Sequence, residues 1–186
     1  MRLFTAILFD EEIKEKIFRI EERLRLEAKK GSFTARDNLH LTLNFIGETN
    51  RLDAVKEAMR LAAESISHKD FDLTIKGFGR FKRREGDIYW LGVEKEPVLL
   101  RLQKGLAKEL KEAGFYDIDD TEYTPHLTLG RRVLIKDGFS AREFEAGIEP
   151  ISMRVGRISL MKSERPDGKL TYTEIYSIPL SSSADN

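Results

Sequence analysis

Two identical tetrapeptides hold the residues of this chain that are best suited to chemistry. The sequence His-Leu-Thr-Leu occurs at residues 40–43 and again at residues 126–129, and these copies contain two of the three histidines. On a β-strand successive side chains point to opposite faces, so each histidine shares a face with its threonine while the leucines point the other way. We therefore expect each copy to present an imidazole and a hydroxyl above an apolar backing.

These side chains predict acid–base chemistry on a phosphate ester. An unperturbed histidine has a pKa of roughly 6.5, so one of His40 and His126 can take a proton from water while the other donates one to a departing alkoxide. The hydroxyls of Thr42 and Thr128 can donate to the non-bridging phosphate oxygens. Arg131 closely follows the second motif and offers a fork of donors. This set is typical of metal-free phosphodiester cleavage, and we expect neither a metal ligand set nor a cofactor.

The elements that must position these groups are strands and helices in alternation. Apolar patterns predict strands at residues 1–9, 39–46, 72–81, 88–94, 126–131, 151–161 and 170–178. Helical patterns predict three helices, at about 11–30, 50–67 and 97–114. We expect Asp10 to cap the first helix and Gly31 to end it, Thr49 or Asn50 to cap the second, and Gly114 to end the third.

Both halves of the chain share one order, in which a strand and a helix precede the strand that carries the motif. The repeat predicts an α+β fold of two pseudo-symmetric lobes, each an antiparallel sheet with helices packed outside, around a central cleft that holds both motifs. We expect one bilobal domain over residues 1–180, with halves of about 1–83 and 84–180. Residues 181–186 read as a flexible tail.

Composition narrows the class of protein. The 186 residues include 32 basic and 32 acidic side chains, 34% charged and 40% hydrophobic residues, and no cysteine. The absence of cysteine excludes disulfides, thiolate nucleophiles and zinc fingers. No apolar run approaches the roughly 18 residues of a membrane span, and the first residues lack the pattern of a signal peptide. A net charge of zero argues against coating long nucleic acid but allows a local basic pocket. We expect a soluble, cytoplasmic monomer.

The sequence resembles the two-histidine (2H) phosphoesterase superfamily, and within it the RNA 2′,3′-cyclic phosphodiesterases, also called 2′-5′ RNA ligases. Besides the motifs themselves, the matching pieces are Met-Arg-Leu-Phe-Thr-Ala-Ile at 1–7, the flanks of the first motif over 38–48, Trp-Leu-Gly-Val at 90–93 and Thr-Pro-His-Leu-Thr-Leu-Gly-Arg at 124–131. The resemblance runs from residue 1 to about residue 180. The chain departs from the usual pattern at 87–89, where family members often carry an Arg, and at 163–169.

The resemblance implies a role for each site residue. His40 is the general acid, His126 is the general base, Thr42 and Thr128 bind the phosphate, and Arg131 assists. The implied reaction opens RNA 2′,3′-cyclic phosphate ends to 2′-phosphates, and the same geometry can form a 2′-5′ linkage. The implied partner is an RNA end, with tRNA fragments as one candidate.

Several alternatives stay open from the sequence. The substrate could be a small cyclic nucleotide or a 2′-5′ oligonucleotide, the protein could bind RNA ends without turnover, and a histidine-ligated metal hydrolase is disfavoured because a third ligand is not evident. The basic run 82–84 is either an RNA contact or a solvated turn. Tyr123 and Phe45 either stack on a terminal base or belong to the rim or core.

Overall fold

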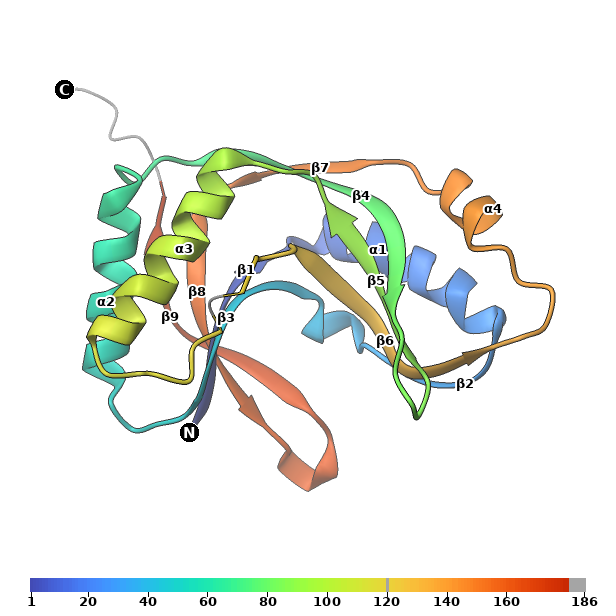
Figure 1. Cartoon of the computed structure of the whole chain (residues 1–186), viewed down its shortest axis with the longest axis horizontal. Coiled ribbons are helices and arrows are strands. Elements are labelled where there is room, and N and C mark those ends of the chain that lie inside the picture. Colours follow the sequence, from blue (N-terminus) through green and yellow to red (C-terminus); the bar gives the residue numbers. More distant parts are fainter. Residues whose placement is uncertain (120, 181–186) are drawn as a thin grey trace.

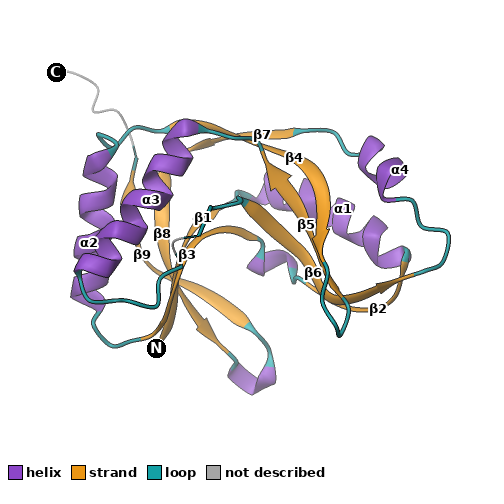
Figure 2. Cartoon of the chain, viewed as in Figure 1, coloured by secondary structure: helices purple, strands orange, loops and turns teal. Residues whose placement is uncertain are grey.

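The computed structural model describes residues 1–119 and 121–180, which fold into two antiparallel sheets flanked by helices (Figures 1 and 2). The first sheet has the order β3 (His40–Glu48), β1 (Arg2–Leu8), β8 (Arg157–Glu164) and β9 (Thr171–Pro179). The second has the order β2 (Ala28–Phe33), β6 (His126–Ile135), β5 (Asp87–Val93), β4 (Phe71–Phe81) and β7 (Ile151–Val155). The helices are α1 (Glu11–Leu26), α2 (Leu52–Ser65), α3 (Pro97–Glu112) and the short α4 (Ala141–Ala146). The predicted α+β class and two-lobed architecture are confirmed.

The chain crosses between the sheets in both directions. Helix α1 follows β1 of the first sheet but packs against β2 and β7 of the second, whereas α3 follows β5 of the second sheet and packs against β3 and α2 of the first (Figure 1). Strands β8 and β9 return to pair beside β1. Each lobe therefore contains strands from both halves of the sequence. Helices α1 and α3 cover the sheet that their preceding strand does not join, whereas α2 follows β3 and packs against β9 of the same sheet and against α3.

Local sequence explains where α1 begins. The Asp10 carboxylate accepts a hydrogen bond from the backbone N–H of Ile13 at 2.8 Å, as expected of an N-cap. The apolar side chains of α1 are buried against the second sheet: Ile13, Ile17, Ile20 and Leu24. The predicted end of this helix was wrong, because α1 stops at Leu26 and residues 28–33 form β2. That strand pairs with β6, about a hundred residues later, and such a distant partner leaves no periodic signal in a six-residue segment.

Two other predicted boundaries differ from the structure. The single strand expected over 151–161 is two strands that separate at Gly156, because β7 pairs with β4 while β8 pairs with β1 of the other sheet. The second helix is capped at Arg51 without a side-chain bond, and Thr49 instead accepts a hydrogen bond from the Arg51 N–H. Helix α4 was not predicted.

The third helix agrees with its prediction. Pro97 opens α3, where its missing N–H costs nothing, and Gly114 follows the helix at a φ of +87°. The predicted flexible tail at 181–186 lies outside the described residues. Among the described helices, none has the length and apolarity that a membrane span requires.

Candidate active site

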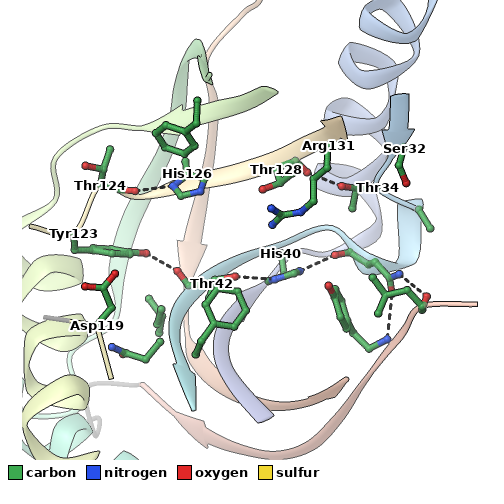
Figure 3. A pocket seen from close by; sticks show the side chains of 18 of the residues that line it. Ser32, Thr34, His40, Thr42, Asp119, Tyr123, Thr124, His126, Thr128 and Arg131 are labelled. Carbon is green, nitrogen blue, oxygen red and sulfur yellow. Dashed lines mark hydrogen bonds between the residues drawn. The ribbon is translucent and has the colours of Figure 1, made fainter. Parts of the chain in front are cut away.

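Both motifs occupy the first residues of their strands. His40 opens β3 and His126 opens β6, and the leucines that alternate with the histidines and threonines are buried. The polar members His40, Thr42, His126 and Thr128 all line one cleft of about 810 Å³ between the two sheets (Figure 3). The structure thus brings the four predicted side chains together, and the predicted alternation is confirmed.

A β-bulge follows the threonine in each motif. In β3, Thr42 and Asn44 pair with consecutive residues of β1, and in β6, Thr128 and Gly130 pair with consecutive residues of β5, so the leucine between them is the extra residue. A bulge of this kind shifts the following residues to the opposite face. Asn44 is accordingly buried, while Phe45 is 60% exposed and lines the cleft.

The bulge after the second motif likewise shifts the residues that follow it to the opposite face of the strand. Arg131 stands five residues after His126, as Phe45 stands five residues after His40, and Arg131 also lines the cleft. Two residues after the end of each motif there is thus an equivalent position, which holds an aromatic ring after the first motif and a guanidinium after the second.

His40 is held on both ring nitrogens. Its Nδ1 lies 2.7 Å from the carbonyl oxygen of Asn38, and its Nε2 lies 2.9 Å from the hydroxyl of Thr42. A carbonyl can only accept, so Nδ1 carries hydrogen and, in the neutral ring, Nε2 accepts from the Thr42 hydroxyl. The ring packs against Phe4 at 4.9 Å and perpendicular to Tyr172 at 5.1 Å between centroids.

These surroundings lower the pKa of His40. The largest cause is burial, which disfavours the imidazolium, and the positive charge of Arg131 acts in the same direction. The hydrogen bond to the Asn38 carbonyl partly opposes them. In the free protein the neutral ring is therefore favoured near neutral pH.

His126 shares the Nδ1 arrangement but not the rest. Its Nδ1 lies 2.8 Å from the carbonyl oxygen of Thr124, and its ring is perpendicular to that of Phe81 at 5.0 Å. The Trp90 ring also packs near His126, with 6.1 Å between the ring centroids. Trp90 in turn packs closely on Gly79, where an added Cβ would lie 2.4 Å from the indole. Within the described part of the chain, Nε2 of His126 makes no hydrogen bond to protein.

The cleft is lined by cations that have no carboxylate partner in the part of the chain that the structure describes. Arg83, Arg131, Arg165 and Lys169 all line it, and none forms an ion pair with a described residue. Elsewhere on the surface such pairs are common, as for Arg36 with Glu11 at 2.6 Å and Arg154 with Asp70 at 2.9 Å. Unpaired guanidinium and ammonium groups around a cleft favour an anionic ligand.

The basic Arg131 and the acidic Asp119 lie on opposite sides of the two motifs (Figure 3). Figure 3 shows Arg131 and Ser32 to one side of the motifs and Asp119 and Tyr123 to the other. Asp117 and Glu122 also line the cleft, on the loop that carries Asp119.

Sequence reasoning found some of these side chains and missed others. It singled out Arg131, left Arg83 open between an RNA contact and a solvated turn, and noted 163–169 merely as a departure from the family. Arg165 and Lys169 reach the cleft because the turn between β8 and β9 lies beside it, a placement that depends on tertiary structure. The hydroxyl of Tyr123 donates to the carbonyl of Thr42 at 2.7 Å, so its polar end is engaged by protein.

Two imidazoles and two threonine hydroxyls, repeated as one motif and facing one cleft between two antiparallel sheets, define a protein with a duplicated His-x-Thr site. The family model described as the 2′-5′ RNA ligase superfamily matches residues 9–167. The chain belongs to this family.

Individual relatives agree with that assignment. A protein named RNA 2′,3′-cyclic phosphodiesterase from Thermotoga maritima is 32% identical over 164 residues, which are 88% of this chain and 87% of the relative. A protein of the same name from Methanothermobacter thermautotrophicus is 29% identical over 94% of this chain and 96% of its own. The crystal structure of Escherichia coli LigT in apo form superposes with a TM-score of 0.75 at 29% identity, covering 97% of this chain and 98% of LigT.

Proposed function

We propose that this protein hydrolyses the 2′,3′-cyclic phosphate at RNA ends to a 2′-phosphomonoester, with His40 as general acid and His126 as general base. The observation that carries the proposal is the pair of histidines in one cleft, each with Nδ1 fixed by a carbonyl two residues earlier. With Nδ1 engaged, Nε2 is the nitrogen that transfers the proton in each ring, and in His40 it also contacts the Thr42 hydroxyl. The names of the relatives supply the substrate class.

In the proposed reaction, Nε2 of His126 takes a proton from water as the water oxygen attacks phosphorus. The P–O3′ bond breaks in line with the attack, and the proton on Nε2 of His40 passes to O3′. The products are a 3′-hydroxyl and a 2′-phosphate, and proton exchange with solvent restores both rings. Thr42, Thr128 and Arg131 donate to the non-bridging oxygens as their charge grows. A 5′-hydroxyl in place of water would leave phosphorus bonded to O2′ and O5′, which is a 2′-5′ linkage.

The acid role is compatible with the lowered pKa of His40. A bound cyclic phosphate adds a negative charge beside the ring and opposes the effects of burial and of Arg131. Substrate binding therefore raises the pKa of His40 and recruits the proton that the departing O3′ needs. The free protein favours the neutral ring, and the complex favours the charged one.

An RNA end is favoured over a free mononucleotide by the cations beyond the motifs. Arg83 on the β4–β5 turn and Arg165 and Lys169 on the β8–β9 turn line the cleft in addition to Arg131. One cyclic phosphate does not require four cations, whereas the backbone of an attached strand offers further phosphates. Exposed Phe45 offers a ring on which the terminal base can stack.

Other parts of this proposal extend beyond the reaction. We take the protein to act as a cytoplasmic monomer without a cofactor, with residues 1–180 as one bilobal domain and tRNA fragments among its substrates.

The test is incubation with a short RNA that ends in a 2′,3′-cyclic phosphate, in excess EDTA, with 2′- and 3′-phosphate products resolved. We expect the parent to form the 2′-phosphate, and the His40→Ala and His126→Ala variants to form almost none. His68→Ala is the matched control, because His68 lies outside the cleft lining and contacts the Pro179 carbonyl at 3.3 Å. Bound but unconverted RNA with the parent would contradict hydrolysis and favour an end-binding module. Conversion of cyclic mononucleotides alone would contradict the RNA end as substrate.

A further inference from the structure

Two hydroxyls join each motif to the segment that precedes the other motif. Tyr123, three residues before His126, donates to the carbonyl of Thr42 at 2.7 Å. Thr34, six residues before His40, donates to the carbonyl of Thr128 at 2.8 Å. Figure 3 shows both bonds on opposite sides of the cleft. The arrangement is reciprocal, since each segment leading into one motif holds the threonine carbonyl of the other.

The same two leading segments also orient the histidines. The Asn38 carbonyl accepts from Nδ1 of His40, and the Thr124 carbonyl accepts from Nδ1 of His126. Thr124 is the residue after Tyr123, so one peptide unit lies between the anchor on the first motif and the group that orients the second histidine. On the other side, Asn38 is itself fixed, since its amide donates to the Leu170 carbonyl at 2.9 Å.

The Tyr123 bond reaches strand β3 at the edge of its sheet. Strand β3 is at the edge of its sheet, so its carbonyls on the open side have no strand to pair with. The phenol is largely buried, and burial raises the pKa of Tyr123 well above its ordinary value, so it remains a donor across the working pH range. The Thr34 hydroxyl bond is accompanied by a backbone bond, because the Thr34 N–H donates to the Leu129 carbonyl at 2.9 Å.

We propose that Tyr123 and Thr34 are positioning residues whose hydroxyls set the relative placement of the two His-x-Thr motifs across the cleft. This inference rests on the proposed hydrolysis for its kinetic consequences, because the acid and the base must act on opposite sides of one phosphorus. Small displacements of reacting groups cost large factors in rate. Among the described residues, no backbone bond from Tyr123 accompanies its hydroxyl bond as one does for Thr34, so Tyr123 is the more important of the two.

The first test is the Tyr123→Phe variant, which removes one hydroxyl and keeps the ring. We expect kcat on the cyclic-phosphate RNA to fall about 10- to 100-fold while KM changes less than about threefold. Tyr116→Phe is the matched control, because Tyr116 is 82% exposed and outside the cleft lining. A parental kcat in Tyr123→Phe would overturn the proposal.

The second test separates positioning from general destabilisation. In a His126→Ala background there is no acid–base pair left to align. Adding Tyr123→Phe to this variant should therefore lower kcat by less than about twofold. A loss as large as in the parent would show a structural role alone and overturn the proposal. Thr34→Val should lower kcat, and Thr34→Ser, which keeps the hydroxyl, should restore it. Thr74→Val is the control, because the Thr74 hydroxyl contacts Ser152 of β7 and neither residue lines the cleft.

A third readout needs no turnover, so it separates failure of this inference from failure of the proposed function. Nitrogen-15 NMR of the imidazoles reports the tautomer and environment of His40 and His126. We expect Tyr123→Phe to shift or broaden the His126 signals while Tyr116→Phe leaves them unchanged. Unaltered His126 signals in Tyr123→Phe would overturn the inference whether or not the parent hydrolyses RNA. An inactive parent with altered signals in the variant would contradict the proposed function and leave the positioning role supported.

Discussion

The two copies of His-Leu-Thr-Leu have the same residues, the same Nδ1–carbonyl bond and the same bulge after the threonine, yet their surroundings differ. His40 is packed between Phe4 and Tyr172, bonded to Thr42 through Nε2, and has a lowered pKa. His126 lies against Phe81 and has no protein partner on Nε2 among the described residues. The shared features set where each imidazole points, whereas burial, which is particular to the surroundings of His40, lowers the pKa of that ring. A duplicated motif can in this way supply two different functions.

The positions that follow the motifs differ as well. The bulges direct Phe45 after the first motif and Arg131 after the second into the same cleft. A ring suits a nucleobase, and a guanidinium suits a phosphate. We therefore expect a bound nucleotide to have a preferred direction, with its base beside Phe45 and its phosphate beside Arg131.

The largest expected effect comes from removing the histidines. Each of His40→Ala and His126→Ala should lower kcat on the cyclic-phosphate RNA roughly 10²- to 10⁴-fold. In the proposed reaction the two histidines act in one concerted step, so the double variant should be little less active than the less active single variant. Steady-state or single-turnover rates of the three proteins check this, and losses that multiply would show that the two motifs act independently.

The threonines should separate the two motifs more finely. Thr42→Val and Thr128→Val should each cost on the order of 1–3 kcal/mol in kcat/KM, through loss of a donor to the phosphate. Thr42 also bonds Nε2 of His40, so Thr42→Val should in addition change the pH dependence, whereas Thr128→Val should lower the rate at every pH alike. Profiles of kcat/KM against pH are the measurement. Identical profiles in the two variants would contradict the difference between the copies.

The positions after the bulges give a matched pair of smaller effects. Phe45→Ala should raise KM roughly 5- to 10-fold by removing a stacking surface, with the greater loss on strongly stacking purine ends. Arg131→Gln should weaken phosphate binding, and it should also raise the pKa of His40, because the positive charge of Arg131 lowers it. The titration of the His40 imidazole, followed by NMR, should then move to higher pH in Arg131→Gln and stay in place in Phe45→Ala. A shift in both variants, or in neither, would argue against this division.

The smallest expected effect is on stability. The folded-state pKa of His40 lies below its unfolded value of roughly 6.5, so its contribution to stability is present above that pH and is lost as the pH falls through the folded pKa. Glu21 acts in the opposite sense, because burial raises its pKa to about 7 and its contribution is lost as the pH rises through that value. Urea unfolding of the parent and of His40→Asn at pH 5 and pH 7.5 isolates the histidine. The parent should lose more stability in acid than the variant, and equal losses would contradict the lowered pKa.

The sequence allowed much of the site to be predicted, because alternation along a strand is a local property. It placed His40 and Thr42 on one face and their leucines on the other, and the repetition of the motif predicted two lobes and a shared cleft. Arg131 was accessible to the same reasoning because of its spacing from His126. The position of Phe45 was not settled, since a bulge inserts one residue and reverses the face.

The remaining features depend on contacts between distant segments. The pairing of β2 with β6 and the separation of β7 from β8 are set by partners far along the chain. Arg165 enters the cleft because a turn folds beside it, and the bond from Tyr123 to Thr42 joins residues 81 apart in sequence. No local pattern encodes these contacts.

The most direct test of the central claim, that the two equivalent histidines act as acid and base, is the dependence of kcat/KM on pH for the parent with the cyclic-phosphate RNA in EDTA. The account predicts a bell-shaped profile whose limbs are each abolished by substitution of one histidine. A profile that is flat from pH 5 to 8, or one that keeps both limbs in His40→Ala or His126→Ala, would contradict it.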